Sequence, residues 1–179
     1  MHISYRVDEQ DRLIQVGEMW GAFARENRAP QLVGADRLRP SLWSFISGQE
    51  TVHLYRLLLQ RVRDEHVSIT IPYRCDAPAR RRYMTRTFRP DKDGHADFLS
   101  QNHRSEDREP LAILAPGPVH HSDLITMCSF CKRVAYGGGW GEIEDAIATM
   151  RLFERELPPP ISHGACPGCY KIVMDQLKS

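Results

Sequence analysis

The chain lacks an apolar run near the roughly 20 residues that a helix needs to cross a bilayer. Its first residues, MHISYRVDEQDR, also lack the apolar stretch of a signal peptide. Neither charge dominates, because 24 Lys and Arg residues stand against 23 Asp and Glu residues, for a formal net charge of +1. A near-neutral chain has no overall field that attracts nucleic acid or an anionic membrane. We therefore expect a soluble cytoplasmic protein with no membrane partner.

Motifs of common enzymes are missing as well. The sequence has no kinase-type phosphate-binding glycine loop and no serine–histidine–acid arrangement around a nucleophile elbow. We therefore expect a protein that is not an enzyme. With 179 residues, of which 41% are hydrophobic and 26% charged, the chain has the composition of a globular protein with room for one medium domain, or a small domain and an appendage.

The first hundred residues carry the periodicities of an α+β fold. Period-two alternation and a turn at 91–94 predict five strands, at residues 3–7, 13–17, 67–75, 82–89 and 96–102. The helical period predicts a short helix at 18–27 and a long one at 51–66, where Leu54, Leu58 and Val62 share a face. On the strand at 67–75, Val67 and Cys75 are expected on the same face. This order of elements predicts helices packed on an antiparallel sheet.

The same region resembles a PAS domain. The resemblance rests on DRLIQVGEMWGAFARENRAPQLVG, LWSFISG, ETVHLYRLLLQRVR and ITIPYRCDAPARRRYMT. It implies a five-stranded antiparallel sheet with helices on one face, and often a pocket between them for a small molecule or cofactor. PAS domains sense such ligands or mediate dimerisation. No helix-turn-helix or other output module is visible, so the resemblance implies a sensor or adaptor.

Several residues bear on what such a pocket would hold. Some haem-binding PAS domains use a helical histidine, but His53 has no specifying motif, so we expect it at the surface or half-buried. The motif of flavin-binding photosensors is absent, and Cys75 is expected to be a small core residue. On a strand, Arg80, Arg82 and Arg86 would share one face. They could hold an anionic ligand, but charge runs are usually exposed, so we expect a solvated sheet face.

Two Cys-x-x-Cys pairs give the strongest signal in the sequence. Cys128 and Cys131 lie in MCSFCKRV, and Cys166 and Cys169 lie in ACPGCY, where Pro-Gly suits the sharp turn that lets two thiolates reach one ion. Four thiolates satisfy tetrahedral Zn²⁺ and leave no position for substrate, so the sequence predicts a structural zinc site. In a reducing compartment, clustered cysteines bind metal more often than they form disulfides.

Other interpretations of the cysteines remain open at this point. A thioredoxin-like dithiol needs a βαβ context and only one such motif, and four thiolates could also hold an iron–sulfur cluster. His163 could replace one thiolate, or it could contact a cysteine sulfur from outside the ligand set. The tandem histidines at 120–121 are a weaker metal candidate. Whether the metal would be permanent or a redox switch also stays open.

The cysteine-bearing segment has two predicted helices. A stripe of apolar residues predicts a helix at 140–156, and a second helix is expected to open at Cys169. The stripe consists of Ile143, Ala146, Ile147, Met150 and Phe153. A cysteine pair on a turn, followed by a pair at a helix start, resembles a treble-clef or zinc-ribbon-like knuckle. The tail CSFCKRV…W…IE…ISHGACPGCY resembles a cysteine-rich tail of bacterial signalling proteins, which implies a signalling context.

These expectations combine into one organisation. We predict a PAS-like sensor domain at 1–106, a connector rich in charge and proline at 107–123, and a zinc-binding module at 124–179. The leading interpretation is a non-enzymatic bacterial signalling protein that binds a partner protein, forms a homodimer and could hold a small molecule in its pocket. The alternative is a nucleic-acid-binding transcriptional regulator that uses Lys132, Arg133 and Lys171 near the cysteines. The acidic residues of the same segment and the near-neutral charge disfavour it.

Overall fold

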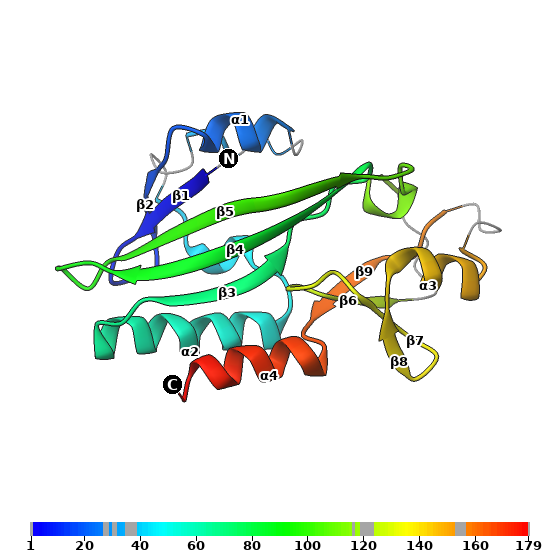
Figure 1. Cartoon of the computed structure of the whole chain (residues 1–179). Helices are drawn as coiled ribbons and strands as arrows, with labels where there is room; N and C mark the ends of the chain where they lie inside the picture. The colour runs from blue at the N-terminus through cyan, green and yellow to red at the C-terminus, as the bar shows by residue number, and fades with distance from the viewer. Residues whose placement is uncertain are drawn as a thin grey trace.

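The computed structural model describes residues 2–26, 29, 32–34, 39–115, 117–118, 124–152 and 157–178. Within these residues lies a five-stranded antiparallel sheet of order β2-β1-β5-β4-β3, which confirms the predicted α+β class (Figure 1). Its strands are β1 His2–Val7, β2 Leu13–Val16, β3 Ile69–Arg74, β4 Arg80–Pro90 and β5 Ala96–Asp107. The helical segments beside it are α1 Trp20–Glu26, a 3-10 turn Leu42–Phe45 and α2 Gln49–Glu65.

The sheet packs against α2 through large apolar side chains. Leu54, Leu58 and Val62 are fully buried on α2, as the helical period predicts, and they share one core with Phe88 and Phe98 of the sheet. The helix ends at Glu65, and its C-cap residue is His66, whose φ of 54° is left-handed. The residues between this helix and Ile69, the first residue of β3, do not pair with the sheet. The expectation that Val67 shares the inward face of β3 is therefore wrong: Val67 precedes the strand and is 37% exposed.

Strands β4 and β5 are longer than the hydrophobic pattern predicts. They form a ladder that continues to Arg80 opposite Asp107, which lies in the range predicted for the connector. The alternation of apolar residues stops earlier, but the backbone pairing does not, because polar cross-strand pairs continue it. The Arg80 guanidinium donates to the Asp107 carboxylate at 2.9 Å, and the Tyr83 hydroxyl donates to Glu106 at 3.0 Å.

The C-terminal part forms a second sheet of four strands, of order β8-β7-β6-β9, in which β6 and β9 are parallel. Its elements are β6 Ile125–Cys128, β7 Val134–Tyr136, β8 Gly139–Gly141, α3 Ile143–Thr149, β9 Ile161–Gly164 and α4 Pro167–Gln176. A second apolar cluster joins Ile125, Met127 and Val134 to Ile143 and Ile147 of α3. A short 3-10 turn, Ala112–Leu114, precedes this part.

The predicted helix at 140–156 is wrong in its bounds. Trp140 lies in β8 and pairs with Ala135, because Gly137 and Gly138 adopt positive φ values of 57° and 79° and turn the chain into a hairpin. The helix therefore begins at Ile143 and ends at Thr149. Its buried face keeps the first part of the predicted stripe, whereas Phe153 lies outside the described residues. Helix α4 begins at Pro167, two residues before the predicted start, as suits proline in a first turn.

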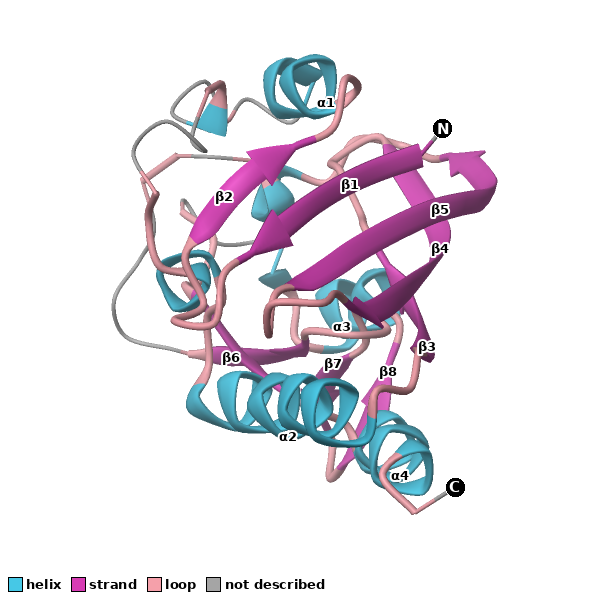
Figure 2. Cartoon of the chain, turned by 90° about the vertical axis from the view of Figure 1, so that its left-hand side faces the viewer, coloured by secondary structure: helices cyan, strands magenta, loops and turns pink. Residues whose placement is uncertain are grey.

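The two parts of the chain share one hydrophobic core. Cys128, Phe130, Ala165, Cys166 and Val173 belong to the same buried cluster as the α2 and sheet residues. Helix α4 runs beside α2 (Figures 1 and 2), and the Arg61 guanidinium of α2 donates to the Gln176 carbonyl at 2.6 Å. The edge of β3 also meets the cysteine-bearing turn, where the Arg74 amide donates to the Phe130 carbonyl at 2.6 Å. The two parts of the chain therefore pack together through a continuous core.

Among the described helices, none combines the length and the apolar character that crossing a membrane requires.

Candidate metal centre

Two parallel strands bring the cysteine pairs together. Cys128 is the last residue of β6 and lies opposite Gly164, the last residue of β9. Because the two strands are parallel, the turns that follow them lie at the same end of the sheet. After β6 the chain turns sharply, and this turn holds Cys131: the Lys132 amide donates to the Cys128 carbonyl at 3.0 Å, and the Cys128 amide donates to the Arg133 carbonyl at 2.7 Å. After β9, Cys166 caps α4 and Cys169 lies in its first turn.

The four sulfur atoms have the spacing of a metal-binding site. All four Sγ atoms lie within 4.8 Å of one another, and the Cys131 and Cys166 Sγ atoms are 3.6 Å apart. A tetrahedral zinc ion with Zn–S bonds of about 2.3 Å separates its sulfur ligands by about 3.8 Å. No described cysteine forms a disulfide. The residues Cys128, Cys131, Cys166 and Cys169 are therefore positioned to hold a metal ion.

The electrostatics of the cluster favour a cation among the sulfurs. Hydrogen bonding to Cys128 raises the pKa of Cys131 to about 12, and the same neighbour raises the pKa of Cys169 far above its usual range. Four thiolates this close repel one another, so they cannot all be ionised without positive charge between them. A divalent ion supplies that charge. The Cys166 amide, which donates to the Cys128 sulfur at 3.3 Å, adds a smaller stabilisation at the start of α4.

Lys132 and His163 lie beside the cysteines without joining the group of four. The Lys132 ammonium donates to the Ser129 carbonyl at 3.0 Å, and burial lowers its pKa. His163 is half-buried on β9, and burial together with nearby Lys132 lowers its pKa. Among the described residues, no hydrogen bond joins His163 to a cysteine sulfur. His53 is exposed on α2, and the histidines at 120–121 lie outside the described residues.

The start of α2 packs against β9, the strand that precedes the second cysteine pair. The Glu50 carboxylate accepts a hydrogen bond from the Ala165 amide at 2.7 Å, and the Thr51 and Ser129 hydroxyls are 2.8 Å apart. Gly48, which precedes the helix, has a φ of 89°, and a Cβ there would lie 2.2 Å from the His163 carbonyl oxygen. The sheet-bearing part of the chain therefore holds both cysteine turns in place.

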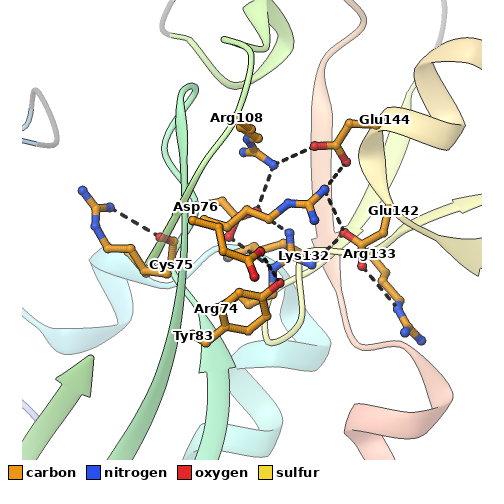
Figure 3. A network of polar contacts seen from close by, with 12 residues as sticks. Arg74, Cys75, Asp76, Tyr83, Arg108, Lys132, Arg133, Glu142 and Glu144 are labelled. Atoms are coloured by element: carbon orange, nitrogen blue, oxygen red, sulfur yellow. Dashed lines mark hydrogen bonds and ion pairs between the residues drawn. The ribbon is translucent and has the colours of Figure 1, made fainter. Parts of the chain in front are cut away.

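Ion pairs form a second connection between the two parts of the chain (Figure 3). Arg74, at the end of β3, donates to the Glu142 carboxylate at 2.7 Å and to the Asp76 carboxylate. Glu142 is the residue before α3, so this contact ties the sheet to the C-terminal part. The side chains of Arg74 and Asp76 are nearly buried. Removing one partner of such a pair strongly destabilises a protein, because the charge of the other partner stays buried.

The network continues from Asp76 to the first turn of α3. Arg108, which follows β5, contacts Asp76 at 3.3 Å and Glu144 at 3.1 Å. The Arg81 guanidinium of β4 pairs with the other oxygen of Glu144 at 2.6 Å. Sequence reasoning missed this network, because its partners are far apart in the chain and each alone looks like a surface charge. Hereafter the interaction network means Arg74, Arg81, Arg108, Asp76, Glu142 and Glu144.

The arginines of β4 do not form the expected solvated face. Arg80, Arg82 and Arg86 do share a face of the strand, but it is the face that carries buried Met84 and Phe88. Of these three, Arg80 alone is exposed. Arg82 is buried and donates to the Glu26 carboxylate at 2.6 Å, and Arg86 donates to the Tyr55 hydroxyl of α2 at 2.8 Å. Tyrosine hydroxyls and rings supply the negative potential that this interior guanidinium needs.

A surface cleft opens at the candidate metal centre. Its volume is about 570 Å³, and it lies where β3 and β4 meet the cysteine turns and α4. Apolar and aromatic side chains line the cleft together with charged side chains: the first group includes Pro72, Tyr73, Tyr83, Met84 and Ile172, and the second consists of Arg74, Arg133 and Glu142. Cys131 and Cys169, one from each pair, also line it, whereas Cys128 and Cys166 do not. The site therefore has an open side and a closed side.

No protein-family model matches the chain, and a search of curated proteins found no match.

Proposed function

We propose that the four cysteines bind one structural Zn²⁺ ion in a treble-clef-like arrangement. Four thiolates at tetrahedral spacing suit zinc, and a closed set of four protein ligands leaves no position for a substrate. The zinc would hold the turn after β6 to the first turn of α4. Because its neighbours belong to the main core, the ion would stabilise both parts of the chain.

We further propose that the protein is a non-enzymatic bacterial signalling protein built on a PAS-like sheet. The quoted sequence resemblance and a five-stranded antiparallel sheet packed on α2 support this assignment. The observation that carries the proposal is the shared core. A signal that alters the sheet or α2 reaches the cysteine turns through direct contacts of Gly48, Glu50 and Thr51, without crossing a flexible linker.

Within this proposal, recognition of a partner protein is favoured over sensing of a small molecule. The space between the sheet and α2 is filled by side chains that are fully buried, including Leu54, Leu58, Phe88 and Phe98. A ligand in that space would have to displace them, at the cost of close-packed contacts. We therefore place the signalling role in binding a protein, either another signalling protein or a second copy of this chain.

Native mass spectrometry and affinity capture together test this function. We expect native mass spectrometry to show a protein that carries no small molecule. We also expect it to be a homodimer or to bind a defined protein, and to keep that binding when both components are purified. Retention of a stoichiometric small molecule, without any protein partner, would favour a ligand sensor instead. A monomer that binds neither a ligand nor a protein would contradict the signalling proposal.

A further inference from the structure

The two sides of the cysteine cluster differ in their access to solvent. Cys128 is 0% exposed and Cys166 is 5% exposed, and both belong to the main hydrophobic core. Cys131 and Cys169 are half-buried and line the cleft of about 570 Å³. This difference in exposure follows from the fold. The first cysteine of each pair belongs to the main core, whereas the second is only partly buried and packs against that core.

The cleft suits a small, neutral reactant. The cleft gives such a molecule an approach to the two sulfurs, it is far larger than a peroxide, and its lining offers both polar and apolar side chains. The Cys131 and Cys169 Sγ atoms lie within 4.8 Å of each other in the cluster. Oxidation of one sulfur therefore places the resulting sulfenic acid within reach of a second thiolate.

We propose that Cys131 and Cys169 form a modification site for small peroxides. The inference rests on the metal binding proposed above, which keeps both sulfurs as thiolates. One thiolate attacks hydrogen peroxide, the O–O bond breaks, and a sulfenic acid and one hydroxide ion form. The second thiolate attacks the sulfenic sulfur, an S–S bond forms, and a second hydroxide ion leaves. Two thiolates thereby lose two electrons, and the peroxide gains them.

The consequence of this step is loss of two of the four metal ligands. Cys128 and Cys166 stay reduced, but two thiolates do not replace a tetrahedral set of four. The metal ion is then released, and the turn that carries Cys131 separates from the core at Phe130. The interaction network lies beside this turn and would weaken with it (Figure 3). Oxidation of the two cysteines would thus change the contacts between the two parts of the chain.

The test uses the full chain carrying Cys75→Ser, so that only the four clustered cysteines can react. The metal content is measured first, and hydrogen peroxide is then added while a chromophoric chelator follows metal release. Reaction aliquots are alkylated, digested and mapped by mass spectrometry. We expect the first disulfide to join Cys131 and Cys169, with one metal ion released for each disulfide.

A first disulfide that contains Cys128 or Cys166 would overturn the inference, and so would metal release without thiol oxidation. Both results would leave the metal proposal intact. Protein that carries no metal before peroxide is added would overturn the metal proposal, and with it this inference. The initial metal measurement therefore separates the two failures.

A pair of variants tests the role of the cleft without altering any cysteine. Ile172 lines the cleft and Tyr170 does not, although both lie on α4 and are 42% and 39% exposed. Ile172→Trp should narrow the approach and slow peroxide-driven metal release several-fold, whereas Tyr170→Trp should leave the rate unchanged. Equal rates in the two variants would show that the cleft is not the route of attack.

Discussion

Among single residues, Gly48 shows how closely the two parts of the chain approach. Its backbone has a φ of 89°, and a Cβ would lie 2.2 Å from the His163 carbonyl oxygen. Both conditions exclude a side chain at this position. The contact fixes the start of α2 against β9, which leads directly to Cys166 and Cys169. The sequence marks Gly48 only as a residue before a helix, because the clash involves a strand more than 100 residues further along.

We predict that Gly48→Ala destabilises the protein through backbone strain and this clash. The strain alone should cost about 1 to 3 kcal/mol, and the clash should add to it. Gly138→Ala is the matched control, since Gly138 also has a positive φ of 79° but would meet no atom within 4 Å. Urea unfolding measures both variants. Equal losses of stability would show that the Gly48–His163 contact contributes nothing.

The charged side chains of the interaction network behave differently from those at the surface. Asp76 is almost buried between Arg74 and Arg108, whereas Asp107 pairs with Arg80 in solvent. We predict that Asp76→Asn lowers the free energy of unfolding by about 3 kcal/mol, since it removes the carboxylate between two nearly buried guanidinium groups, each of which then keeps a single acidic partner. Asp107→Asn should have a much smaller effect, because solvent screens an exposed ion pair. Chemical denaturation compares them, and a smaller effect at Asp76 would contradict this assignment.

Glu144 makes the stability of the network depend on pH. Burial raises the pKa of this carboxyl, but the hydrogen bond and charge of Arg81, with Arg108, outweigh burial and hold the pKa below its usual range. A depressed pKa in the folded state stabilises the protein above the unfolded pKa, and this contribution is lost as the pH falls through the folded value.

Wild-type protein should therefore lose more stability than Glu144→Gln when the pH falls from 7 into the range below 4.5. Urea unfolding at several pH values measures both proteins. The difference between them removes the common effect of acid on the cysteine cluster. Parallel pH profiles would mean that the Glu144 carboxylate contributes no stability through its ion pairs.

At the level of whole elements, patterns of side-chain period predict structure well where one face is buried. Leu54, Leu58 and Val62 predict α2, and the alternation at 3–7 predicts β1. The same reasoning gives the wrong bounds for the helix expected at 140–156, because it gives the apolar stripe more weight than Gly137 and Gly138. The positive φ values of these two glycines turn the chain into a hairpin before the helix begins. It also fails for the β4 arginines, whose tyrosine and glutamate partners come from distant elements.

The candidate metal site is predictable from the sequence because its ligands carry a local spacing. Each Cys-x-x-Cys pair is readable alone, and only their meeting requires the fold. The cleft and the unequal exposure of the four sulfurs cannot be read in this way. The cleft and the exposure of each sulfur depend on how the sheet and α4 cover the two cysteine turns. That arrangement is set by the packing of β3 and α2, which the local spacing of cysteines does not reveal.

On the scale of the whole molecule, the shared core links the candidate metal centre to the sheet. We predict that removal of the metal ion by a strong chelator lowers protection against hydrogen exchange in α2 as well as in α4, because both helices pack on Phe130 and the buried cysteines. Mass spectrometry of peptides from each helix measures this. Loss of protection in α4 alone would show that the C-terminal part opens independently.

The central claim is that the four cysteines hold one metal ion. Native mass spectrometry of freshly purified protein, beside a denatured control, tests it most directly. We predict a mass excess of one zinc ion in the wild type and in Cys75→Ser, and no bound metal in Cys166→Ser. Wild-type protein without metal, in which each cysteine pair has lost two hydrogens, would mean disulfides and would contradict the account.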